Sequence, residues 1–62
     1  MKKQARSDRL WSIDEVSYYL GIPVATLYKW SHLGIGPRVF GVGRHLRYDP
    51  DVVRQWLYDD AA

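Results

Sequence analysis

The stretch SIDEVSYYLGIPVATLYKWSHLG, residues 12–34, decides the fold, because it carries two helix signals separated by a short turn. Ser12 and Glu15 have the spacing of a capping box, in which each side chain accepts a hydrogen bond from the backbone N–H of the other residue. Three apolar residues follow at helical spacing: Ile13, Val16 and Leu20. This pattern predicts a first helix over residues 13–20 that ends before Gly21.

A second helix is predicted directly after the turn. Proline is tolerated in the first turn of a helix, so the helix begins at Pro23 or Val24 and ends before Gly34. Leu27 and Trp30 form its narrow apolar stripe. Two short helices joined by a tight turn that contains glycine are typical of a helix-turn-helix, although other helical corners share the pattern.

The segment IGPRVFGVGRHLRYD, residues 35–49, has the composition of a β-hairpin, with β-branched and aromatic runs on either side of two glycines. We expect strands over residues 38–41 and 45–48. The loop between them is predicted to hold about three to four residues, and Gly41 and Gly43 permit it to turn tightly.

Leu46 and Tyr48 fall on one face of the second predicted strand, and they must pack against the helices because a two-stranded hairpin alone is marginal. Asp49 and Pro50 then begin a third helix. The predicted fold is mainly α with a small β-hairpin, a winged helix-turn-helix in the order helix, helix, hairpin, helix. The predicted divisions of the chain are a basic flexible arm at 1–9, a winged helix-turn-helix domain at 10–59 and a tail at 60–62.

Charge in this 62-residue chain is segregated, although the formal net charge is only +2. No acid occurs from Val16 to Tyr48, a span that holds one lysine, three arginines and two histidines. This segregation indicates a polyanionic partner such as double-stranded DNA, with chance placement of a few charges as the alternative.

Several function classes are excluded by the residues that are present. The chain has no cysteine, and two histidines are too few for a metal site. The acids at 14–15 and at 49–51 begin helices, where carboxylates favour the positive end of the helix dipole. We therefore expect no enzyme, no catalytic residue, no metal and no cofactor. No apolar run approaches the roughly 20 residues that span a bilayer, so we expect a cytoplasmic protein that acts on DNA without a membrane.

Candidate DNA-contacting residues lie on the outer face of the second helix and in the hairpin. On the helix, the candidates for entry into a major groove are Ala25, Thr26, Tyr28 and Lys29. In the wing, the candidates for contact with phosphates or a narrow minor groove are Arg38, Arg44, His45 and Arg47. The alternative role for the wing arginines is an ion pair with Asp49 or Asp51. We expect the basic groups to form one continuous cationic ridge that straddles a duplex.

Residues 12–57 resemble the small winged-helix proteins of the excisionase type, which are recombination directionality factors of phages and mobile elements. These proteins are akin to the DNA-binding half of the MerR regulators. The shared motifs are S-x-x-E, L-G-I, T-L-Y-K-W, G-R-x-x-R-Y and the final DVVRQWL. Pro23 departs from the family pattern, which usually has Ser or Thr there, and Tyr28 and Lys29 stand where relatives often carry arginine.

The resemblance implies that the second helix enters the major groove and that the wing contacts the DNA backbone or minor groove. It also implies a protein that binds repeated attachment-site sequences cooperatively, bends DNA and directs a phage integrase toward excision. MerR regulators carry a long dimerisation helix after this domain, whereas this sequence stops at LYDDAA. We therefore expect a monomer in solution that assembles head to tail on DNA.

Two other functions stay open at this point. A small MerR-like transcriptional regulator would use the same fold. A protein-interaction module would use the apolar side of the wing, or the acidic YDD segment at 58–60, to hold a partner such as an integrase.

Overall fold

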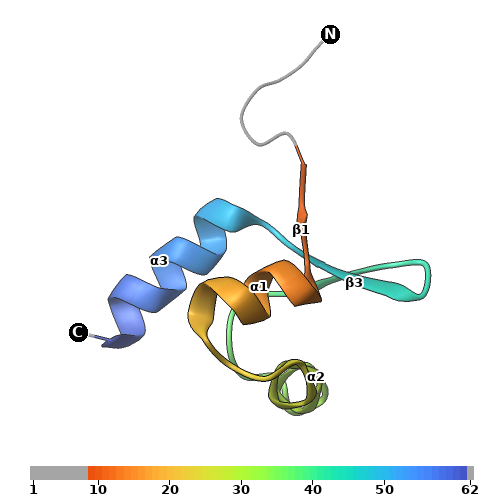
Figure 1. Cartoon of the computed structure of the whole chain (residues 1–62), viewed down its shortest axis with the longest axis horizontal. Coiled ribbons are helices and arrows are strands. Elements are labelled where there is room, and N and C mark those ends of the chain that lie inside the picture. Colours follow the sequence, from red (N-terminus) through yellow and green to blue (C-terminus); the bar gives the residue numbers. More distant parts are fainter. Residues whose placement is uncertain (1–8, 62) are drawn as a thin grey trace, which may run out of the picture.

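The computed structural model describes residues 9–61 of the chain. Its elements are β1 (Trp11–Ser12), α1 (Ile13–Leu20), α2 (Val24–Leu33), β2 (Phe40–Val42), β3 (His45–Tyr48) and α3 (Pro50–Ala61). The hairpin of β2 and β3 projects from one side of the helical body, and α3 lies on the opposite side (Figure 1). This arrangement of three helices and a small antiparallel sheet confirms the predicted fold class, consistent with a winged helix.

The first helix has the start that the sequence predicts. The Ser12 hydroxyl accepts a hydrogen bond from the Glu15 N–H at 3.1 Å, and Oε1 of Glu15 accepts one from the Ser12 N–H at 2.8 Å. These bonds satisfy two N–H groups that a helix start otherwise leaves unpaired. The Ser17 hydroxyl donates to the carbonyl of Ile22 at 2.6 Å and so ties α1 to the turn that follows it.

The second helix begins at Val24 and ends at Leu33, as predicted. Pro23 stands at its cap position and provides no side-chain hydrogen bond to the helix start. The carbonyl of Pro23 instead accepts from the N–H groups of Thr26 and Leu27, at 3.0 and 3.2 Å. The missing cap therefore leaves the fold intact, and α2 is held mainly by the burial of its apolar side.

The sheet has one strand more than the sequence predicts. Strand β3 lies in the centre, with β1 and β2 antiparallel on either side of it, and Trp11 pairs with Tyr48 in the β1–β3 ladder. The prediction missed β1 because its two residues have no alternating pattern of their own. Pairing with β1 attaches the hairpin to the start of α1.

The hairpin is also tighter than predicted. Strand β2 covers residues 40–42 instead of 38–41, and Val42 pairs with His45, so the loop holds only Gly43 and Arg44. Gly43 has φ of 63°, the positive value that suits glycine at the first position of a two-residue turn. Gly41 is a paired strand residue opposite Leu46 and takes no part in the turn.

The core draws one or two side chains from each main element. Its buried members are Ile13, Val16, Leu27, Tyr48 and Val53. Tyr48 is only 2% exposed, and Leu46 packs against the same cluster, which confirms that this face of β3 leans on the helices. The hairpin direction is therefore fixed by a buried tyrosine.

The third helix closes the core from the other side. Oδ1 of Asp49 accepts a hydrogen bond from the Asp51 N–H at 2.9 Å, which confirms the predicted start of α3. The rings of Trp30 and Trp56 lie 6.0 Å apart, so α2 and α3 meet through two half-buried tryptophans. A Cβ at Gly36 would lie 2.6 Å from Cε3 of Trp30, so only glycine leaves room for that ring.

Two predicted segments lie at the ends of the chain. The predicted arm falls outside the described residues except for Arg9, whose guanidinium pairs with Oε2 of Glu15 at 3.0 Å. Helix α3 continues to Ala61, into the segment assigned to a tail. Within residues 9–61, no helix combines the length and the apolar character that crossing a membrane would require.

Candidate nucleic-acid interface

The outer face of α2 is a stripe of exposed residues opposite the core. Leu27 is 1% exposed and marks the inner side, while the residues on the far side recur at helical spacing. They are Ala25, Tyr28, Lys29 and His32. Neither the first turn of α2 nor the rest of the helix carries an acid, so nothing on this face repels a phosphate.

The four predicted helix residues do not share one direction. Positions two apart in a helix differ by about 200° around its axis, so Thr26 and Tyr28 lie on opposite flanks of the face that Ala25 and Lys29 centre. Thr26 is half-buried, whereas Tyr28 is 45% exposed.

Tyr28 influences the pKa of the buried Tyr48 side chain of β3. Burial raises the pKa of Tyr48 above its ordinary value, and the neighbouring phenol of Tyr28 raises that pKa further.

His32 belongs to this face, although it was not among the candidates predicted from the sequence. It is exposed and stands seven positions after Ala25, which returns it to the same side of the helix. The spacing 25, 28, 29 and 32 was the signal that could have placed it there. A histidine in the last turn can donate a hydrogen bond from a ring N–H to a DNA phosphate or base acceptor.

The wing presents its basic residues in different ways. Arg44 occupies the second position of the turn and is exposed, as is His45 beside it. Arg47 is half-buried and donates from Nη1 to the Leu46 carbonyl at 3.1 Å. Arg38 precedes β2, and its guanidinium lies 5.3 Å from the centre of the Phe40 ring, so it covers the root of the hairpin.

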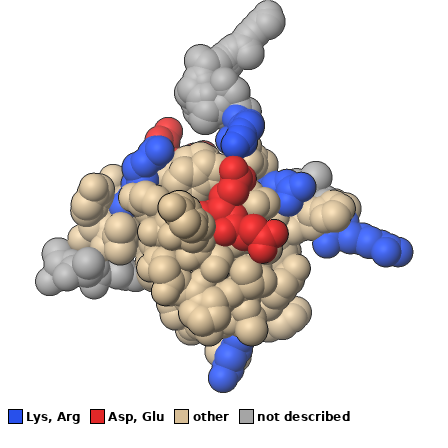
Figure 2. All heavy atoms as spheres, in the orientation of Figure 1, with Lys and Arg blue, Asp and Glu red and all other residues tan. Residues whose placement is uncertain are grey.

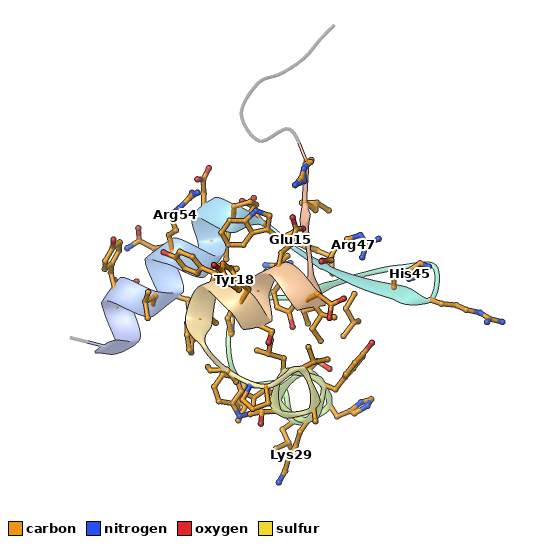
Figure 3. All side chains as sticks on the ribbon, viewed as in Figure 1. Glu15, Tyr18, Lys29, His45, Arg47 and Arg54 are labelled. Atoms are coloured by element: carbon orange, nitrogen blue, oxygen red, sulfur yellow. The ribbon has the colours of Figure 1, made fainter. Side chains whose placement is uncertain are left out.

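The expected continuous cationic ridge does not form. Lys29 points away from the body at the lower edge of the molecule, while Arg47 and His45 lie along the hairpin at a distance from it (Figure 3). Figure 2 shows acidic atoms gathered in the middle of this face and basic atoms around its margin. The physical reason is strand alternation, because Arg47 stands on the face of β3 opposite to Leu46 and Tyr48, which turn toward the helices.

Two separate candidate contact surfaces remain in place of the ridge. One is the outer face of α2, and the other is the wing tip, which we define as Arg44 and His45. Among the described side chains, the ion pairs join Arg9 to Glu15 and Arg54 to Asp51, at 3.0 and 2.8 Å. Asp51 is thus engaged by its own helix neighbour, and neither pair includes a wing arginine.

Within the described residues, no three histidine, cysteine or carboxylate side chains come together in a way that could hold a metal ion. The groups that the two surfaces do present are hydrogen-bond donors, positive charges and an aromatic ring. Such groups can bind an anionic polymer and read hydrogen-bonding groups on base edges.

Comparison with protein families gives one match. A family model described as a helix-turn-helix domain matches residues 12–58, from the end of β1 to near the end of α3. Comparisons with curated proteins and with solved structures found no match to the chain.

Proposed function

The chain belongs to the helix-turn-helix domain family, and from this premise we propose that it is a sequence-specific DNA-binding protein that acts as an excisionase-like accessory factor. A helix-turn-helix domain implies binding to double-stranded DNA, and the family includes excisionase-like DNA-binding proteins. The finer role, as a factor that directs an integrase toward excision, is the part that we propose.

The observation that carries the proposal is the outer face of α2. The helix is short and acid-free, it is held from behind by Leu27, and it turns Tyr28, Lys29 and His32 to solvent. A major groove about 12 Å wide admits one α-helix, and side chains on its outer face then reach base edges. Lys29 suits an acceptor on guanine or a phosphate, and Tyr28 suits a phosphate beside the groove.

The wing tip supports the same mode of binding. Arg44 stands on a two-residue turn at the end of a hairpin that projects beyond the helices, as Figure 1 shows. Its guanidinium has no ion-pair partner among the side chains that the structure describes, so it is free to reach a phosphate or a narrow minor groove next to the site of α2.

The role in excision rests on the resemblance of residues 12–57 to excisionases. Such a protein would occupy repeated sites, bend the DNA and bring an integrase onto its recombination site. We propose that this protein does so as a monomer in solution that assembles head to tail on the repeats.

A gel-shift titration tests both levels of the proposal. The probes are an attachment-site duplex that neighbours the coding sequence, a promoter duplex from the same region and a duplex of scrambled sequence, each with and without integrase. We expect a ladder of complexes on the attachment site and further retardation with integrase. Equal affinity for all three duplexes would contradict sequence-specific binding. A single complex on the promoter duplex, with no effect of integrase, would favour a transcriptional regulator instead.

A further inference from the structure

A groove on the exposed side of α1 has no part in the DNA contacts described above. Its walls are Trp11, Asp14, Glu15, Tyr18 and Tyr19. The rings of Trp11 and Tyr19 lie 5.2 Å apart, and Tyr18 is 91% exposed. These three aromatic side chains line the groove together with the carboxylates of Asp14 and Glu15. Tyr18 contributes almost nothing to the core, and its exposure is unexplained by the fold.

The chemistry of this groove fits a guanidinium or ammonium group. Two arginines of the chain already use its margin in the two ways that such groups bind. The Arg54 guanidinium lies 5.5 Å from the centre of the Trp11 ring, and the Arg9 guanidinium pairs with Glu15 at 3.0 Å. Aromatic rings attract cations through their faces, and carboxylates bind guanidinium groups through charge-assisted hydrogen bonds.

Asp14 and Tyr18 are the part of the groove that these two arginines leave open. They are four residues apart on α1 and therefore neighbours on its surface. Asp14 is exposed and takes part in neither ion pair formed among residues 9–61. A cation from outside would find a carboxylate and an aromatic ring side by side here.

We propose that this groove is the docking surface for an arginine- or lysine-bearing segment of a partner protein. Glu15 and Tyr18 lie on α1 toward the viewer, whereas Lys29 points away at the lower edge (Figure 3). Because the groove and the outer face of α2 are separate, both can be occupied together. The choice of a basic partner rests on the proposed function, since a second protein bound to the same DNA would carry exposed basic segments.

The test is an NMR titration of the full-length, isotope-labelled protein at low salt, without DNA. The probe is a capped Gly-Arg-Ala-Arg-Gly peptide, and its control is the same peptide with glutamate in place of arginine. We expect saturable amide shifts confined to residues 11–19 with the arginine peptide alone. Asp14→Asn and Tyr18→Ala should each weaken binding by about two- to fivefold. Asp59→Asn, which removes an exposed acid near the end of α3 that takes part in neither ion pair, should leave the affinity unchanged.

Several results would overturn the proposal. The absence of saturable shifts would do so, as would equal binding by the Asp14→Asn protein. Concentration-dependent self-association that Tyr18→Ala abolishes would identify a second copy of the chain as the occupant. A triple variant, Lys2→Gln with Lys3→Gln and Arg6→Gln, tests the chain's own first residues. If the amide shifts of residues 11–19 in this variant differ from those of the parent protein without peptide, the first residues are the occupant.

Repeating the titration on the protein saturated with duplex separates this proposal from the proposed function. Loss of peptide binding only in the presence of duplex would contradict simultaneous occupation of both surfaces. Failure to bind any duplex would instead contradict the proposed function, because the peptide titration of the free protein does not depend on DNA.

Discussion

Replacing Arg44 with glutamine tests whether the wing tip contacts the DNA backbone. The change removes one positive charge from an exposed turn and disrupts no ion pair formed among residues 9–61. Because Gly43 supplies the positive φ of the turn, residue 44 is free to vary without strain in the hairpin. We therefore expect an intact fold and weaker binding to every duplex, whatever its sequence.

The size of the effect follows from counterion release. Each neutralised phosphate adds about 0.9 to the negative slope of log affinity against log salt concentration. For one contact, raising the salt from ~50 to ~200 mM lowers the affinity by about 3.5-fold. The Arg44→Gln protein should lack this salt-dependent contribution to DNA affinity. The difference in affinity between the parent and the Arg44→Gln protein should therefore shrink by about 3.5-fold between ~50 and ~200 mM salt.

Fluorescence anisotropy with a labelled duplex, repeated at several salt concentrations, measures the slope. Arg54→Gln is the matched control, since it also removes one exposed arginine but acts on α3, away from the wing in Figure 3. An unchanged slope for Arg44→Gln would remove this residue from the phosphate contacts. The same loss of slope in both proteins would show that only the net charge matters.

Three further predictions concern α2 and the start of α1. Lys29→Ala should change the preference for the DNA site, since a base contact is worth about 1–3 kcal/mol of discrimination. Competition between cognate and single-mismatch duplexes measures this preference. An equal loss of affinity for all sequences would make Lys29 a contact to the DNA backbone. Leu27→Ala should lower the free energy of unfolding, measured by urea titration, by about 2–5 kcal/mol, because the Leu27 side chain is only 1% exposed. Leu33→Ala is the control and should have little effect, because the Leu33 side chain is 60% exposed. The backbone N–H of Ser12 and the guanidinium of Arg9 lower the pKa of Glu15 below its ordinary 4.5. The ionised Glu15 side chain therefore stabilises the folded protein above pH 4.5, and this stabilisation is lost as the pH falls through the lowered pKa. The acid-induced loss of stability should be smaller in Glu15→Gln, and identical pH profiles would contradict the capping role.

The position of the wing depends on the helical body more than on the hairpin itself. A two-stranded ribbon is marginal in water, but here β3 is paired on both sides and inserts Tyr48 into the core. The loss expected for Leu27→Ala is large against the roughly 3–9 kcal/mol typical of a domain of this length. Core variants will therefore disturb DNA binding indirectly, which is why the surface variants above are the sharper tests of function.

The tertiary structure also separates what the sequence placed together. Lys29 and Arg47 belong to one acid-free segment, yet they emerge from an outward helix face and from the outer side of a strand. Segregation of charge along a chain therefore does not establish segregation in space. Figure 2 shows acidic atoms near the middle of the face that it presents. The two acids of α1, Asp14 and Glu15, line the groove that we assign to a cationic partner.

By itself, the sequence determined both ends of α1 and α2, the start of α3 and the existence of a hairpin. These features rest on residues a few positions apart, such as the Ser12–Glu15 capping box, whose hydrogen bonds form within one turn. Only the tertiary structure decided that Trp11 pairs with Tyr48 and that the rings of Trp30 and Trp56 meet. Those contacts join residues distant in the chain, and they depend on how the helices pack around a shared core, which local patterns do not encode.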